Sequence, residues 1–319
     1  MYFSCMKRAA VLYCEAKLMG SAPTGGPDHT RPVHQRMYRR EHPMYLEEYR
    51  KARQMGQKES KLCQSRGGSP YLPVLDEILA EEETCGEVSL GLSDIPLELI
   101  VGTRSAGRSQ AFSRSFLPLM GEDSEFAGKW MALCKAHMDE GIADPIKAYE
   151  YMHTFYVVEG HKRVSVLRYF GAVSIPAEVT RVLPAKNESK ASKIYYEYVD
   201  FYRLSGINYL WFSGVGRFPR LQEAVGKGPD EQWTEDERRK FFSVYSQFSS
   251  LYGDKSAKDL AGRMTTGDAL LLYLDMFGYD QVRDYPQSKL KEGFMQLHQA
   301  FSLKKPLQDL NPLKGLLGR

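Results

Sequence analysis

The stretch Tyr156-Val-Val-Glu-Gly-His-Lys-Arg-Val-Ser165 contains a change from strand-like to helix-like sequence. Residues 155–158 are aromatic or β-branched, which predicts a buried strand. Gly160 permits a tight turn, and from His161 apolar residues recur at helical spacing until Gly171 ends the pattern. The sequence therefore predicts a strand that turns through a glycine into a helix.

The first turn of this helix is a candidate anion site. The backbone N–H groups at a helix start have no partner within the helix and favour negative charge. His161, Lys162 and Arg163 add positive charge there, and cations oppose the helix dipole at this end unless an anion is bound. We therefore interpret the turn as a phosphate-binding site, against the alternative of a charged first turn that faces water.

The side chains of the turn have different expected roles. Arg163 is the strongest candidate because a guanidinium can grip a phosphate through two N–H groups. His161 either donates to the phosphate or only caps the helix. Glu159 either places a metal ion or acts as a general base, or it faces solvent.

A second basic segment is the glycine-rich loop Gly102-Thr-Arg-Ser-Ala-Gly-Arg108. It lacks the Walker-type pattern and is not a P-loop. Arg104 and Arg108 form either a second wall of the same phosphate pocket or an ordinary basic loop.

Composition limits the classes of protein that fit. The chain has 319 residues, long enough for two domains, with an apolar fraction of 43% and a charged fraction of 26% that are typical of a soluble protein. A net charge of +3 gives no indication of nucleic-acid binding from charge alone. The five cysteines form no CxxC pair, which disfavours a structural zinc site or a disulfide framework. We expect a cytoplasmic protein without a membrane span or signal peptide.

Hydrophobic periodicity predicts helices before and after a group of strands. Helices are expected at 43–63, 71–79, 124–140, 193–202, 233–251, 265–277 and 288–301, and strands at 86–92, 94–101, 144–150, 155–158 and 173–182. A short amphipathic helix at 1–18, a Pro/Gly-rich linker at 20–28 and a loosely held tail at 304–319 complete the prediction.

The predicted fold class is α+β, in three parts. A helical preface with a flexible linker covers residues 1–85, a mixed core covers 86–185, and an all-α region covers 186–319. The aromatic residues of the all-α region either pack at helical spacing or stack on bases.

Four segments, in this order, resemble the ParB N-terminal / sulfiredoxin-like family. They are Ile95-Pro-Leu-Glu-Leu-Ile100, Glu140-Gly-Ile-Ala-Asp-Pro-Ile146, Tyr156-Val-Val-Glu-Gly-His-Lys-Arg163 and Gly171-Ala-Val-Ser-Ile-Pro176. The resemblance covers roughly a third of the chain, and the order of the four segments makes it more specific than the Gly-His-Lys-Arg tetrad alone. It implies a small ParB/sulfiredoxin-like core domain at 86–185.

The resemblance also implies a site. In this family the Gly-x-x-Arg turn binds nucleotide phosphates, and the earlier arginine loop can take part. By position, the resemblance implies that Glu159 is a catalytic candidate. The phosphate ligands that it implies are Gly160, His161, Lys162, Arg163, Arg104 and Arg108. Members bind CTP or ATP and include DNA-partitioning clamps, nucleases, small-molecule kinases and sulfiredoxins. The sulfiredoxin branch needs a cysteine in the turn, where this chain has His161-Lys162.

From these features we expect a nucleotide-binding protein, with CTP or ATP and Mg²⁺ on the Gly160 turn. We also expect association with DNA or a protein partner through the C-terminal helices. A homodimer and slow nucleoside triphosphatase activity are further parts of this expectation. No clear helix-turn-helix follows the core, unlike in partition proteins. The alternatives are a non-catalytic interaction protein that uses its C-terminal helices, and a ParB-fold kinase or nuclease.

Two flanking segments, 70–79 and 195–211, resemble regions of bacterial proteins of the BMP family of ABC-transporter substrate-binding proteins. Such proteins normally carry an exported, two-lobed ligand-binding domain. Because 319 residues would not hold that domain beside the core, we do not transfer its function to this chain.

Overall fold

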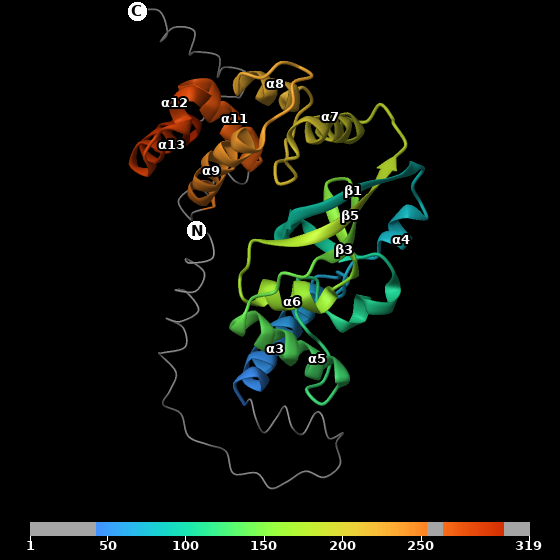
Figure 1. The fold of residues 1–319 in the computed structure, drawn as a ribbon. Coiled ribbons are helices and arrows are strands. Elements are labelled where there is room, and N and C mark those ends of the chain that lie inside the picture. The colour runs from blue at the N-terminus through green and yellow to red at the C-terminus, as the bar shows by residue number, and fades with distance from the viewer. Residues whose placement is uncertain (1–42, 254–263, 303–319) are drawn as a thin grey trace, which may run out of the picture. The chain divides into compact units, whose positions relative to one another are not determined.

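The computed structural model describes residues 43–253 and 264–302 (Figure 1). The helix expected at 1–18, the linker at 20–28 and the tail at 304–319 lie outside these residues. The chain divides into two compact units between Leu183 and Pro184. The α+β prediction is confirmed: helices precede and follow one five-stranded sheet of mixed strand directions.

The sheet of the first unit has the strand order β1-β5-β3-β4-β2. Its strands are β1 (Thr84–Pro96), β2 (Ile100–Thr103), β3 (Ile146–Tyr151), β4 (Thr154–Glu159) and β5 (Ser174–Pro184). β4 is antiparallel to β3 and parallel to β2, and β3 is parallel to β5. β4 is thus an interior strand, which agrees with its run of aromatic and β-branched residues.

Two predicted boundaries were wrong, and a proline lies at each of them. The strand expected at 94–101 is split, since β1 runs through Pro96 and β2 begins only after the 3-10 helix η1 (Leu97–Leu99). The helix expected at 71–79 is confined to α4 (Leu75–Leu79). Pro73 has no N–H and disfavours helical geometry at the residue before it, and Val74 instead pairs with Thr103 at the end of β2.

Three helices cover one face of the sheet in two layers. α6 (His161–Tyr169) packs Val164 and Leu167 against the strands. α5 (Glu125–Asp139) and α3 (Pro43–Ser65) then pack against α6 through a cluster centred on Trp130, whose indole N–H donates to Ser165 at 2.9 Å. Trp130 is fully buried, as expected for a core residue. α4 lies against the opposite face of the sheet, where Leu75 is buried beside tyrosines of β3 and β4.

β3 and β4 form a hairpin whose turn consists of Met152 and His153. Both residues have positive φ, 49° and 64°, which is the geometry of a type I′ turn. Glu150, just before the turn, is fully buried and forms an ion pair with Arg181 of β5, which is 3% exposed. The carboxylate also accepts from the backbone N–H of His153 at 2.7 Å. This buried pair connects the hairpin to β5.

The second unit is all-α, as predicted, over residues 185–253 and 264–302. Its helices are α7 (Lys190–Ser205), α8 (Arg217–Ala224), α9 (Glu235–Tyr252), α11 (Thr266–Phe277), α12 (Tyr279–Arg283) and α13 (Gln287–Ser302). The short helices α8 and α12 were not anticipated. α9 begins with a capping box made by Thr234 and Glu237.

Aromatic side chains form the core of the second unit. Phe212, Phe218, Phe241 and Phe248 are at most 1% exposed, so the packing interpretation of these aromatic residues is confirmed. No helix in the described part of the chain combines the length and the apolarity that crossing a membrane requires.

Candidate functional site

The predicted turn from strand to helix is present. β4 ends at Glu159, Gly160 adopts a left-handed conformation with φ 101°, and α6 begins at His161. A Cβ on Gly160 would lie 2.4 Å from Cγ2 of Ile146, so glycine is required here by both conformation and space. No side chain caps the start of α6, and its first turn contains no acidic residue. This helix start therefore presents positive charge without an internal anion.

His161 is buried at the base of the turn. Its side chain is 7% exposed and packs beside the rings of Phe112 and Phe116. Nε2 lies 2.8 Å from the Thr103 hydroxyl, at the end of β2. Burial, reinforced by the charges of Arg108 and Lys162, lowers the pKa of His161 to about 4. At neutral pH the imidazole is uncharged, and the geometry favours a role in positioning the start of α6 against β2.

Lys162 lies among other cations. Its ammonium group is 4.9 Å from the ring centre of Phe126, in the first turn of α5. Partial burial, and then the charges of Arg108 and Lys129, lower the pKa of Lys162, while Glu125 opposes them. We call Arg108, Lys129 and Lys162, together with Glu125, the cationic cluster.

The cationic cluster has more positive than negative charge. Its carboxylate, on Glu125, is already paired with Lys129 at 2.5 Å. Arg108 is exposed on the 3-10 helix η2 (Ala106–Ala111) that follows β2. Three cations thus converge from η2, α5 and α6 around one carboxylate.

α5 and α6 run in the same direction beside this cluster. Phe126 lies near Lys162, Trp130 contacts Ser165, and His137 contacts Phe170, so the contacts advance together along both helices. Two N-terminal dipole ends therefore lie at the same edge, and both favour anions. Figure 1 shows the two helices on the same side of the sheet.

Arg104 and Arg163 have protein partners. Arg104 forms an ion pair with Asp76 at 2.6 Å and stacks on Tyr149, on the face of the sheet that α4 covers. Arg163 stays beside the Gly160 turn, where Nη1 donates to the carbonyl of Pro145 at 2.6 Å. The structure therefore brings together Arg108, His161 and Lys162, places Arg104 on the other face of the sheet, and engages Arg163 with a backbone carbonyl at the turn.

Glu159 is exposed at the end of β4, and its carboxylate makes no hydrogen bond or ion pair with the described residues. Within 43–253 and 264–302, no three His, Cys, Asp or Glu side chains lie close enough together to hold a metal ion. Lys129 was missed from the sequence, where its helical segment showed only a buried stripe. The parallel packing of α5 on α6 brings Lys129 to the site.

Acidification is expected to destabilise the first unit through His161. Since the pKa of His161 falls from 6.5 to about 4 on folding, the unfolded chain binds more protons between these values. The stability that the neutral ring contributes is fully present above pH 6.5. As the pH falls towards 4, the free energy of unfolding decreases by about 3 kcal/mol in total. Urea unfolding of the wild type and His161→Gln across this range measures the effect.

The informative quantity is the difference between the stability losses of the wild type and His161→Gln, because carboxylates in both proteins also titrate near pH 4. The wild type should lose more stability than His161→Gln as the pH falls. Parallel curves for the two proteins would contradict a buried, neutral imidazole.

The chain was compared with protein-family models, with curated proteins and with solved structures, and none of the three comparisons finds a match.

Proposed function

We propose that the start of α6 and the cationic cluster bind the phosphate groups of a nucleotide. The observation that carries the proposal is the convergence of Arg108, Lys129 and Lys162 beside the uncapped helix start. Burial and then the neighbouring cations Arg108 and Lys129 lower the pKa of Lys162, and the second cause means that these cations repel one another. A bound phosphate would reverse this repulsion and accept charge-assisted hydrogen bonds.

The proposed ligands come from three elements. In the proposal, Lys162 and Arg108 supply side-chain donors, and the backbone N–H groups of the first turn of α6 supply further donors. Gly160 permits the left-handed turn, and His161 positions the helix start. We propose a triphosphate because several phosphate groups could contact donors from α6, η2 and α5 together.

The nucleotide part of the proposal rests on the order of segments that resembles ParB-like proteins. The proposed nucleotide is CTP or ATP, with a Mg²⁺ ion coordinated mainly by phosphate oxygens and water. Slow hydrolysis, with Glu159 beside the turn, and nucleotide-dependent association with DNA or a second copy belong to the same proposal.

Isothermal titration with CTP, ATP and the two diphosphates tests the proposal. Lys162→Ala and Arg108→Ala should each weaken triphosphate binding about 10- to 100-fold, because each removes a charge-assisted contact. Lys61→Ala is the matched control, since Lys61 is an exposed lysine on α3. It should leave binding unchanged.

Two results would contradict the proposal: a wild type that binds none of the four nucleotides, or Lys162→Ala and Arg108→Ala variants that bind as tightly as the wild type. Arg163→Ala separates geometry from family resemblance. The contact of Arg163 with Pro145 predicts a small effect on binding, whereas a phosphate-gripping guanidinium predicts a large one.

A further inference from the structure

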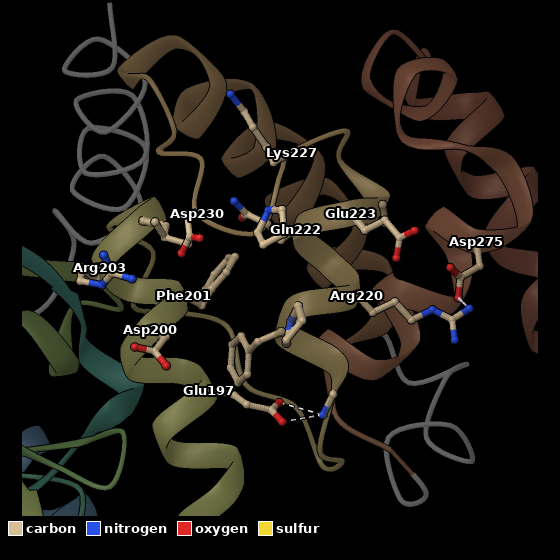
Figure 2. A pocket seen from close by; sticks show the side chains of 16 residues that line it. Glu197, Asp200, Phe201, Arg203, Arg220, Gln222, Glu223, Lys227, Asp230 and Asp275 are labelled. Carbon is tan, nitrogen blue, oxygen red and sulfur yellow. Dashed lines mark hydrogen bonds and ion pairs between the residues drawn. The ribbon is translucent and has the colours of Figure 1, made fainter.

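The second unit contains a groove between α7 and α8 (Figure 2). Its volume is about 1130 Å³, and its floor includes Phe201, Leu204 and Phe218. These three residues belong to the aromatic core and are at most 8% exposed. The floor is therefore rigidly supported, and the walls are formed by longer, charged side chains.

The walls carry more acidic than basic groups. The acidic residues are Glu197, Asp200, Glu223, Asp230 and Asp275, and the basic ones are Arg203, Arg220 and Lys227. This balance is opposite in sign to the net charge of +3 of the whole chain. Figure 2 shows Glu197 and Asp200 on α7, and Glu223 on α8 towards Asp275.

Internal ion pairs neutralise two of the three basic groups. Arg220 pairs with Asp275 at 2.7 Å, and Lys227 pairs with both Glu231 and Glu237 at 2.7 Å. In contrast, Asp200, Glu223 and Asp230 are exposed and make no hydrogen bond or ion pair with other described residues. Their charges are therefore available to a ligand.

Burial is the largest influence on Asp275, and it raises the pKa of this carboxyl group while the nearby Arg220 opposes the shift. Asp275 is paired with Arg220, so the carboxylates that can attract a ligand are those of Asp200, Glu223 and Asp230. Among the exposed groups that line the groove without a partner in the described part of the chain, these three acids outnumber the single cation Arg203. The groove thus combines an apolar floor with walls that carry an excess of negative charge.

We propose that this groove binds an extended segment of a partner protein that carries arginine or lysine side chains between apolar ones. The apolar side chains would lie against Pro219 and Pro229, which are exposed and line the groove, and the basic ones would pair with Asp200 and Glu223. Charge complementarity selects this partner over DNA, because phosphates would be repelled by the same carboxylates. The groove lies wholly in the second unit, so the proposal stands apart from the phosphate site.

The test uses the full chain and two short amidated peptides. One consists of arginine, leucine and serine, and the other has glutamate in place of each arginine. Isothermal titration should show binding of the basic peptide that weakens as salt rises, and no binding of the acidic peptide. The double variant Asp200→Asn/Glu223→Gln should weaken binding about tenfold, which is the expected loss of two partly screened charge pairs.

Glu292→Gln is the matched control, since Glu292 is an exposed acid on α13 that does not line the groove. It should bind the basic peptide like the wild type. Asp200 and Glu223 are exposed, and the single variants Asp200→Asn and Glu223→Gln keep the test available if the double variant fails to fold. Failure of the wild type to bind the basic peptide overturns the proposal. Unchanged binding by folded variants, or displacement of the peptide by duplex DNA, overturns it as well.

Discussion

Replacement of Gly160 by alanine is expected to lower the free energy of unfolding by about 2–5 kcal/mol. Part of this loss is conformational. At φ 101° an L-residue has a backbone conformation that costs roughly 1–2 kcal/mol. The rest is steric, because the new methyl group would lie 2.4 Å from Cγ2 and 2.9 Å from Cβ of Ile146, and overpacking costs about 1–3 kcal/mol.

Two other glycines separate these contributions in urea unfolding experiments. Gly171 has φ 73°, and a methyl group added there would meet no neighbouring side chain or strand within 4 Å, so Gly171→Ala should show only the conformational cost. Gly107 has neither positive φ nor a close neighbour, and Gly107→Ala should change stability by less than about 1 kcal/mol. Equal losses for Gly160→Ala and Gly171→Ala would show that the contact with Ile146 is unimportant.

Replacement of Arg181 by methionine is expected to cost about 3–5 kcal/mol of stability. The substitution leaves the carboxylate of Glu150 charged and fully buried without its cation. Glu150→Gln removes the opposite charge and should also destabilise the protein, although the amide retains some hydrogen-bonding capacity. Equilibrium unfolding in urea measures both losses.

The double variant Glu150→Gln/Arg181→Met provides the control. Removing both charges leaves no unpaired ion, so the double variant should be more stable than Arg181→Met alone. A double variant that loses the sum of the two single effects would mean that the ion pair contributes no coupling energy. The cycle therefore measures the interaction between the hairpin and β5 directly.

The turn itself could be predicted from sequence because every signal for it is local. β4, Gly160 and α6 follow one another in the chain, and each has its own residue pattern. The helices expected at 43–63 and 124–140, which are observed at 43–65 and 125–139, were predicted for the same reason, from one apolar stripe and clear end signals. Residues near each other in sequence determine these elements.

Lys129 could not be predicted in this way, although Lys162 and Arg108 were candidates from sequence. Lys129 and Lys162 lie on different helices, and only the parallel packing of α5 against α6 brings them to one edge. Arg163 was favoured for its chemistry, but the carbonyl of Pro145 lies within its reach and accepts its hydrogen bond. The direction of a side chain depends on tertiary neighbours that periodicity does not reveal.

The position of Arg104 has the same origin. Thr103 points towards His161, and because side chains alternate along a strand, Arg104 projects to the other face, where Asp76 is available. The partners of Thr103 and Arg104 come from distant segments of the chain. The choice between a second wall of the phosphate pocket and an ordinary basic loop therefore required the folded structure.

The parallel pairing of β2 with β4 also has a consequence for the order of folding. The β3–β4 hairpin, Gly160 and α6 are contiguous, and such local structure forms early. Thr103 and His161 are 58 residues apart, and Arg108 reaches the α6 turn only after β2 has closed this long loop. Because loop closure of this kind is slow, we expect the turn to form before β2 joins the sheet, and therefore before the cationic cluster is complete.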